Sequence, residues 1–139
     1  MLALTGGTLL SGCSAPLDFG SPERLPVLIG PAVANDTDRD HDYRVRVACG
    51  ETLDATPERR FDRSGTVRAR GRAAVDGDWP NRAGRYRVAV SVDGGTWRTQ
   101  DLTERLVQEE QVCYAQTASI TDSDAVSFWT NLDAPCPDR

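Results

Sequence analysis

Lysine is missing from this chain, histidine is nearly so, and long apolar runs are scarce. All sixteen basic residues are arginine, and one histidine stands among 139 residues. A blue-copper centre needs two histidines and a cysteine, and one histidine also leaves too few ligands for a structural zinc site. No segment approaches the twenty or so apolar residues of a membrane span. The sequence therefore excludes these two metal sites and a transmembrane helix.

The same shortage bears on catalysis. A Ser–His–Asp arrangement can use only His41, which lies in a polar segment with no G-x-S-x-G nucleophile turn nearby. Gly94-Gly95 is a turn and not a phosphate-binding loop. We therefore expect a protein that is not an enzyme and has no cofactor.

What is abundant is aspartate, which outnumbers glutamate fifteen to six, and the net charge is −5. An aspartate-rich surface without lysine is typical of proteins that stay hydrated in concentrated salt, although a GC-rich genome alone also replaces lysine by arginine. The length fits one domain with a core of its own. The acidic total argues against nucleic acid as a partner.

The N-terminus carries an export signature. Apolar and small residues lead into Leu10-Ser11-Gly12-Cys13, which resembles a prokaryotic lipobox, and no arginine precedes it. The resemblance implies a truncated lipoprotein signal over residues 1–13, with its start upstream and a lipid on Cys13. Residues 14–24, rich in proline, serine and glycine, read as a tether, and residues 25–139 as the domain. We expect a lipid anchor on the outer face of the cytoplasmic membrane.

Two motifs overlap after the first expected strand, 25–33. Asn35-Asp36-Thr37 is a glycosylation sequon at Asn35 if the chain is exported. Asp36, Asp38 and Asp40 then alternate as oxygen ligands do at the start of a calcium loop. An EF-hand is excluded because His41 replaces the required glycine. A looser calcium site and a solvated acidic loop remain the alternatives.

Alternating apolar residues predict the strands. The clearest run is 85–92, where Tyr86, Val88 and Val90 share one face before Asp93-Gly94-Gly95 turns the chain into a hairpin that ends near 102. Further strands are expected over 43–49, over 51–62 (an edge strand broken near Pro57) and over 66–75, followed by a corner loop over 76–83 with Trp79. Residues 103–111 are expected to form a helical turn or a polar extension. The chain is expected to end in a hairpin of 112–120 with 126–132 that turns at 122–124. In that last hairpin we expect Ile120 beside Val126 and Tyr114 beside Leu132.

Two runs carry a family resemblance. The pattern G-x-Y-x-V-x-V from Gly84, and N-D-T-D-x-x-H-x-Y-x-V-x-V from Asn35, resemble the Ig-like β-sandwich surface lipoproteins of halophilic archaea. The resemblance implies an all-β, antiparallel Ig-like sandwich of seven or eight strands. It also implies that Tyr86 bonds back to the backbone of a corner. It implies no activity.

Three cysteines remain beside Cys13. The expected hairpin register brings Cys113 near Cys136, and an exported domain favours pairing them. Cys49 is then a buried free thiol, while Cys49–Cys136 and Cys49–Cys113 remain alternatives.

Positive charge is concentrated between residues 59 and 98, which hold ten arginines and four acids. If neighbouring strands present them, Arg68, Arg70, Arg72, Arg85 and Arg87 form a basic stripe able to bind an anionic glycan. The alternative is an ordinary solvated face with paired charges. We thus expect a non-enzymatic cell-surface lipoprotein module that meets a surface protein or glycan, or alternatively an ion- or glycan-binding protein using 36–42 or this stripe.

Overall fold

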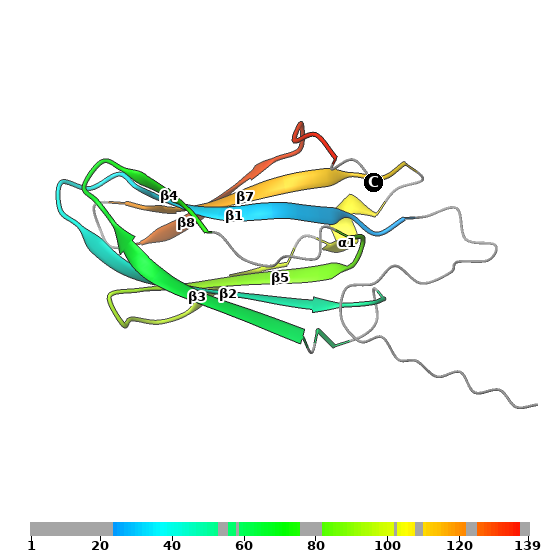
Figure 1. The fold of residues 1–139 in the computed structure, drawn as a ribbon, viewed down its shortest axis with the longest axis horizontal. Helices are drawn as coiled ribbons and strands as arrows, with labels where there is room; N and C mark the ends of the chain where they lie inside the picture. The colour runs from blue at the N-terminus through cyan, green and yellow to red at the C-terminus, as the bar shows by residue number, and fades with distance from the viewer. Residues whose placement is uncertain are drawn as a thin grey trace, which may run out of the picture.

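Eight strands and one helical turn form a β-sandwich (Figure 1). The computed structural model describes residues 24–52, 56–57, 59–75, 82–101, 103–107, 110–121 and 125–136. The elements are β1 (Val27–Asn35), β2 (His41–Gly50), β3 (Arg59–Val67), β4 (Arg72–Ala74), β5 (Arg85–Val92), β6 (Arg98–Gln100), α1 (Thr103–Leu106), β7 (Cys113–Ile120) and β8 (Val126–Asn131). The expected all-β sandwich of about eight strands is confirmed.

The strands divide into two sheets of four. Sheet I has the order β4-β1-β7-β8, and sheet II has the order β3-β2-β5-β6. Every pair of strands is antiparallel except β1 with β7, which run parallel from Val27 beside Cys113 to Asn35 beside Ile120. The expectation of purely antiparallel sheets is therefore wrong at this pair. Strands joined by a tight hairpin must run antiparallel, but β1 and β7 are not joined in this way. The chain leaves sheet I after β1 and passes through strands of both sheets before it reaches β7.

The single strand expected over 66–75 is also wrong. β3 ends at Val67, and a turn at Arg68–Gly71 carries the chain from sheet II to β4 in sheet I. Arg70 has a positive φ of 60° there, and Gly71 N donates to Arg68 O at 2.8 Å. Small residues at alternate positions predicted one face of one strand, but they belong to two strands of different sheets. Figure 1 shows β3 and β4 meeting at one end of the sandwich.

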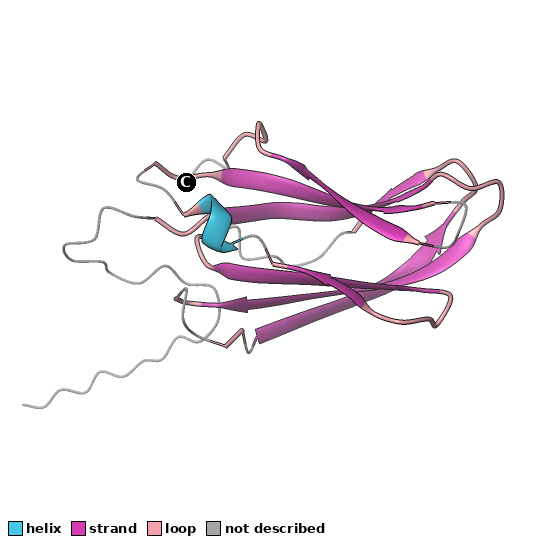
Figure 2. Ribbon diagram, turned by 180° about the vertical axis from the view of Figure 1, so that it is seen from behind, coloured by secondary structure: helices cyan, strands magenta, loops and turns pink. Residues whose placement is uncertain are grey.

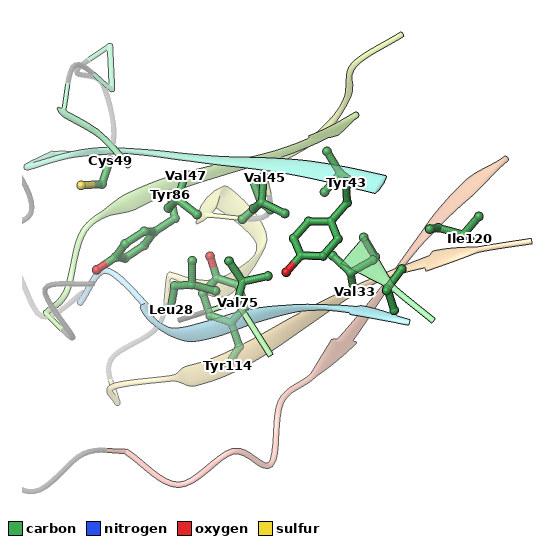
Figure 3. Close-up of a cluster of buried hydrophobic side chains, with 14 of the residues drawn as sticks. Leu28, Val33, Tyr43, Val45, Val47, Cys49, Val75, Tyr86, Tyr114 and Ile120 are labelled. Carbon is green, nitrogen blue, oxygen red and sulfur yellow. The ribbon is translucent and has the colours of Figure 1, made fainter. Parts of the chain in front are cut away.

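The core lies between the sheets (Figure 3). The alternating residues of β2 and β5 point inward as expected and are almost fully buried. They pack against inward residues of β1 and β7, and the main buried members are Leu28, Val33, Val45, Val47, Val67, Val88, Val90, Tyr114 and Ile120. α1 covers the end of this core opposite the β3–β4 turn, where Leu106 is buried (Figure 2). No helix in the described ranges is long and apolar enough to cross a membrane.

Tyr86 fastens the start of β5. Its ring is 1% exposed and its Oη donates to Arg82 O at 2.5 Å. This is the bond to a corner that the pattern around Gly84 predicted. The hairpin turn is also as predicted: Asp93 and Gly94 both have positive φ, and Gly95 N donates to Val92 O at 2.9 Å. An Asp-Gly pair with two positive φ values is the preferred two-residue hairpin turn.

The last hairpin has the expected register over most of its length. Ile120 lies beside Val126 and Ala118 beside Phe128. Leu132, however, is 55% exposed, so its expected inward position beside Tyr114 is wrong. β8 ends at Asn131, because the chain turns there toward Cys136.

The disulfide Cys113–Cys136 is confirmed, with Cα atoms 5.2 Å apart. Cys49, expected as a free thiol, is instead disulfide-bonded. Its side chain is fully buried, so burial was foreseen correctly and the redox state was not.

Several sequence-based expectations lie outside the described residues. They concern the signal segment with Cys13, nearly all of the tether, Trp79 in the corner loop, and the turn at 122–124. The edge strand expected over 51–62 is found in part: β3 begins at Arg59 after Pro57 and is an edge strand of sheet II, but it shares only residues 59–62 with the expected range.

Candidate functional site

Three turns meet at one end of the sandwich, which we call the loop end: 36–40, 68–71 and 93–95. Arg70 N donates to Thr37 O and so joins the first two turns, and Asp93 N donates to Asp42 O and so joins the third turn to the start of β2, directly after 36–40. In Figure 1 the β1–β2 and β3–β4 connections lie together at this end, away from α1. The loop end holds the candidate metal ligands, the sequon and the chain's histidine.

The alternating aspartates do not converge on a shared point. Asp40 Oδ1 accepts a bond from Ala69 N at 2.9 Å, and Asp42 Oδ1 accepts one from Thr66 Oγ1 at 2.8 Å. The described residues contain no group of three or more His, Cys, Asp or Glu side chains able to hold a metal ion. The weak metal candidates Asp36, Asp38 and Asp40 are therefore not brought together. Two of the acidic side chains in this segment instead tie the loop to the end of β3 and to the β3–β4 turn.

The sequon at Asn35 is part of the loop end's interior. The Asn35 side chain is 1% exposed, and its Nδ2 donates to the carbonyls of Arg39, Val67 and Arg68 at 2.7 to 3.2 Å. Its Oδ1 accepts from Thr37 N at 2.9 Å. A glycan needs this same nitrogen exposed to solvent. The folded domain therefore leaves no place for a glycan at Asn35, contrary to the sequence-based expectation.

A chain of three side chains runs from the β5–β6 turn into this interior. Asp93 Oδ2 lies 2.6 Å from His41 Nδ1, and His41 Nε2 lies 3.0 Å from Thr37 Oγ1. The His41 side chain is fully buried and Thr37 is 4% exposed. The bond to His41 holds the pKa of the Asp93 carboxyl below its usual value. The order aspartate–histidine–hydroxyl is that of a catalytic triad.

The hydrogen bonds nevertheless assign this trio a structural role. Thr37 Oγ1 lies 2.6 Å from Asn35 Oδ1 and 3.0 Å from Arg39 O, which can both only accept, so the hydroxyl proton points to one of these two oxygens and not to His41. In a catalytic triad the hydroxyl donates to the histidine that removes its proton, whereas here the hydroxyl proton is committed to another acceptor. The trio closes the loop end, and its hydroxyl is not a poised nucleophile.

Sequence reasoning missed this trio. His41 was placed in a polar loop, but it begins β2 and points inward with Tyr43 and Val45. The alternation of the following strand, extended back by one step, is the signal that puts His41 inside. Nothing local identifies Asp93 as its partner, because 52 positions separate them.

The five arginines of the expected stripe are not neighbours. Arg68 and Arg70 lie in the β3–β4 turn, and Arg72 lies on β4 of sheet I. Arg85 and Arg87 lie on β5 of sheet II, beside Gly50 and Ala48 at the far end of β2. The stripe required 66–75 to be one strand next to β5, and the chain changes sheets instead.

A different set of arginines gathers on the outward side of sheet II. Arg44 and Arg46 alternate with inward valines on β2, and the guanidinium carbons lie 5.4 and 4.7 Å from the ring centre of Trp97. Arg60 and Arg87 flank Ala48 on the same side, from β3 and β5. We call Arg44, Arg46, Arg60, Arg87 and Trp97 the arginine face. The acids on or beside it are Asp62, 2.8 Å from Arg46, Asp101, 3.7 Å from Arg87, and Asp42, which precedes Arg44 on the outward side of β2.

A shallow open hollow lies beside the β5–β6 turn. Its lining residues are Val92, Asp93, Gly95, Thr96, Arg98 and Val126. The carboxylate of Asp93 is already bonded to His41 and to Asp42 N, so Arg98 is the lining charge that remains for a ligand.

Compared with known proteins, this chain matches no family model, no curated protein and no solved structure.

Proposed function

We propose that this protein is a non-enzymatic module of the cell surface, held to the outer face of the cytoplasmic membrane by a lipid on Cys13. The observation that carries the proposal is the Cys113–Cys136 disulfide. Disulfides persist mainly in oxidising surroundings such as the outside of the cell, and export agrees with the Leu10–Cys13 motif. The role of such a module is to bind a surface protein or glycan or to support a larger surface structure.

The domain at residues 25–139 is, on this proposal, a member of the wider Ig-like class. The corner bond of Tyr86 supports that assignment. The strand order departs from a constant immunoglobulin domain, because β1 and β2 lie in different sheets here, whereas the first two strands share a sheet there. The shared feature is thus the sandwich with its tyrosine corner.

Mass spectrometry of the mature N-terminal peptide, purified from the native host, tests the anchor. The expected peptide begins at Cys13 and carries the mass of a diacylglyceryl lipid. An unprocessed N-terminus would overturn the proposal. The lipid requires that Cys13 is not in a disulfide, because a thioether and a disulfide use the same sulfur atom. Since Cys113 is bonded to Cys136, Cys13 is the one other cysteine of the sequence with which the bonded Cys49 could pair, so a mature peptide in which Cys13 is joined to Cys49 would overturn the proposal. Detergent partitioning of a Cys13→Ser variant gives a second readout, since the lipid-free chain enters the aqueous phase.

A second function, recognition of an anionic glycan, is favoured by the arginine face. Arg44 lies over Trp97 and has no acidic partner within the described residues. Guanidinium groups bind carboxylates and sulfates through two parallel hydrogen bonds, and stacking on an aromatic ring fixes the guanidinium plane. A linear chain of uronic or sulfated sugars therefore fits this arginine-rich side of sheet II.

Binding of heparin, used as a sulfated and uronic probe, tests this second function by calorimetry at low salt. Arg44→Gln and Arg87→Gln are each expected to raise Kd about tenfold, the usual loss for one charged hydrogen bond. Arg72→Gln is the matched control, because it removes one exposed arginine from sheet I and leaves the arginine face intact. Equal losses from all three variants would show that net charge, and not this face, governs binding.

A further inference from the structure

The two sheets expose four edge strands, and three of them are protected against pairing with another chain. β4 (RAA) and β6 (RTQ) are three residues long and carry an arginine each. β3 (RRFDRSGTV) carries four charged residues. Short length and charge are the usual devices that stop a sheet edge from adding a foreign strand.

β8 has none of these protections. Its six residues, VSFWTN, contain no charge, no proline and no glycine. Within the described residues its backbone pairs only with β7, so the row of donors and acceptors on its other side has no strand beside it. A long, uncharged edge of this kind is where a sheet continues into another molecule.

Side chains on both faces of β8 are also exposed. Trp129 points outward and is 66% exposed, the most exposed large apolar side chain among the described residues. On the inward side Val126 and Phe128 are only partly buried, although they contact the core. The strand at the corresponding edge of sheet II is β6, which is only three residues long. A further strand beside β8 would cover this apolar surface.

We propose that β8 pairs antiparallel with β8 of a second copy of this chain, so that two copies of sheet I become one continuous eight-stranded sheet. A two-fold axis perpendicular to the sheet keeps the inward side chains of both copies on one side. Opposed residues must point to the same side of the sheet, so one residue of β8 lies opposite its own copy. With the largest overlap of the two strands, that residue is either Phe128 or Trp129. Aromatic pairs of this kind are among the more favourable cross-strand neighbours.

Charge identifies the second copy as the occupant. A two-fold axis brings each residue near its own copy, so any charge in the edge meets a like charge. β8 carries no charge and avoids that repulsion, whereas β3, β4 and β6 would each bring arginine toward arginine. The net charge of −5 on each chain opposes association at low salt. In molar salt the Debye screening length is about 3 Å, so the repulsion between the two chains is weakened and the dimer becomes stronger.

Sedimentation equilibrium of the full 139-residue chain, in 0.1 M and in 2 M KCl, tests the proposal. We expect a monomer–dimer equilibrium that shifts toward dimer in 2 M KCl. Ser127→Lys places a like charge in each β8 edge and is expected to raise the dimer Kd at least tenfold, or about 1.4 kcal/mol. Ser64→Lys, at another exposed outward serine but on the β3 edge, is the matched control and leaves Kd unchanged.

The melting temperature of each variant's monomer confirms that the fold is intact. Trp129→Ser, which keeps the strand uncharged and removes the exposed ring, is expected to weaken the dimer in the same direction. A monomer at all concentrations in both salts would overturn the proposal. A dimer that survives Ser127→Lys, or that Ser64→Lys dissociates, would also overturn it, because the interface would then lie elsewhere.

Discussion

Asp93 Oδ2 and His41 Nδ1 lie 2.6 Å apart, and their contact joins the β5–β6 turn to the first residue of β2. The other oxygen of the same carboxylate accepts a bond from Asp42 N at 2.9 Å. The carboxylate of Asp93 thus contacts the start of β2 at two points, the buried ring of His41 and the backbone nitrogen of Asp42. The positive φ of Asp93, 51°, sets the turn in which this occurs.

Asp93→Asn tests the charge of this contact without changing the turn, because Asn-Gly suits the same turn as Asp-Gly. The pKa of Asp93 is lowered in the fold, first by its bond to His41. Its contribution to stability is therefore complete above the unfolded pKa of about 4 and is lost as the pH falls below it. We expect the substitution to lower the free energy of unfolding by about 1 kcal/mol at pH 7.

Urea unfolding from pH 7 to pH 2.5 measures this effect. The difference between the two proteins is expected to shrink below about pH 4, where protonation removes the charge from the wild type. Asp38→Asn, in the exposed part of the same loop end, is the control and is expected to change little. A difference that stays constant with pH would mean that the charge of Asp93 plays no part.

Tyr86→Phe removes the corner bond to Arg82 O and leaves the buried ring in place. A loss of about 1 kcal/mol at pH 7 is expected, typical of a buried hydrogen bond whose acceptor loses its partner. Burial raises the pKa of Tyr86 to about 12. The neutral hydroxyl therefore stabilises the fold fully below the unfolded pKa of about 10, and this contribution falls as the pH rises toward 12.

Thermal melts at pH 7 and at about pH 10.5 check both statements. The fall in Tm between the two pH values should be smaller in Tyr86→Phe than in the wild type. Tyr114→Phe is the control at neutral pH. Burial also raises the pKa of Tyr114, but its Oη makes no hydrogen bond within the described part of the chain. An equal loss at pH 7 from both substitutions would mean that the corner bond adds nothing.

Replacing Cys113 and Cys136 together by serine opens the loop that their bond closes, with a separation of 23 residues. Loop closure over that length stabilises by about 3 kcal/mol, so the double variant should unfold at distinctly lower denaturant concentration. Denaturation of the double variant with and without a reductant separates this bond from the disulfide of Cys49. If the double variant kept wild-type stability, the bond would serve some purpose other than holding the end of β8.

Gln116 is buried on β7, and its Nε2 has no hydrogen-bond partner within the described structure. An unpaired buried amide costs about 1–3 kcal/mol, whereas methionine of similar shape has no such group. Gln116→Met is therefore expected to raise the free energy of unfolding by about 1 kcal/mol. Gln116→Glu is the opposite control, since a buried carboxylate is worse. A loss of stability in the methionine variant would mean that Nε2 has a partner, such as a water.

Local patterns foresaw the parts of the fold that local physics decides. The alternation around Tyr86 predicted both the inward face of β5 and the corner bond, and the apolar register of the last hairpin predicted Cys113–Cys136. The change of sheet at Arg68–Gly71 escaped, since the same alternation continues through the turn. Because of this change of sheet, the predicted arginine stripe does not form. The arginines of the arginine face lie on three strands, β2, β3 and β5, and no local sequence pattern shows that these strands are neighbours.

The candidate site was foreseen least, and for the same reason. Asn35, His41 and Asp40 were read as surface groups because each lies among charged residues. In the fold each is bonded to an atom at least 29 positions away, namely Val67 O, Asp93 Oδ2 and Ala69 N. Polar residues that bond across such spans are indistinguishable in sequence from polar residues that face water.

The parallel pair β1–β7 has a consequence for how the chain is made. Sheet II needs only residues 41–100, so its strands can pair as soon as that stretch has emerged. β1 is synthesised first but gains its main partner only when residues 113–120 follow, so sheet I closes last. Until then the inward residues of β1 have no completed sheet around them. The final strands therefore decide when the earliest one becomes protected from proteases and from other chains.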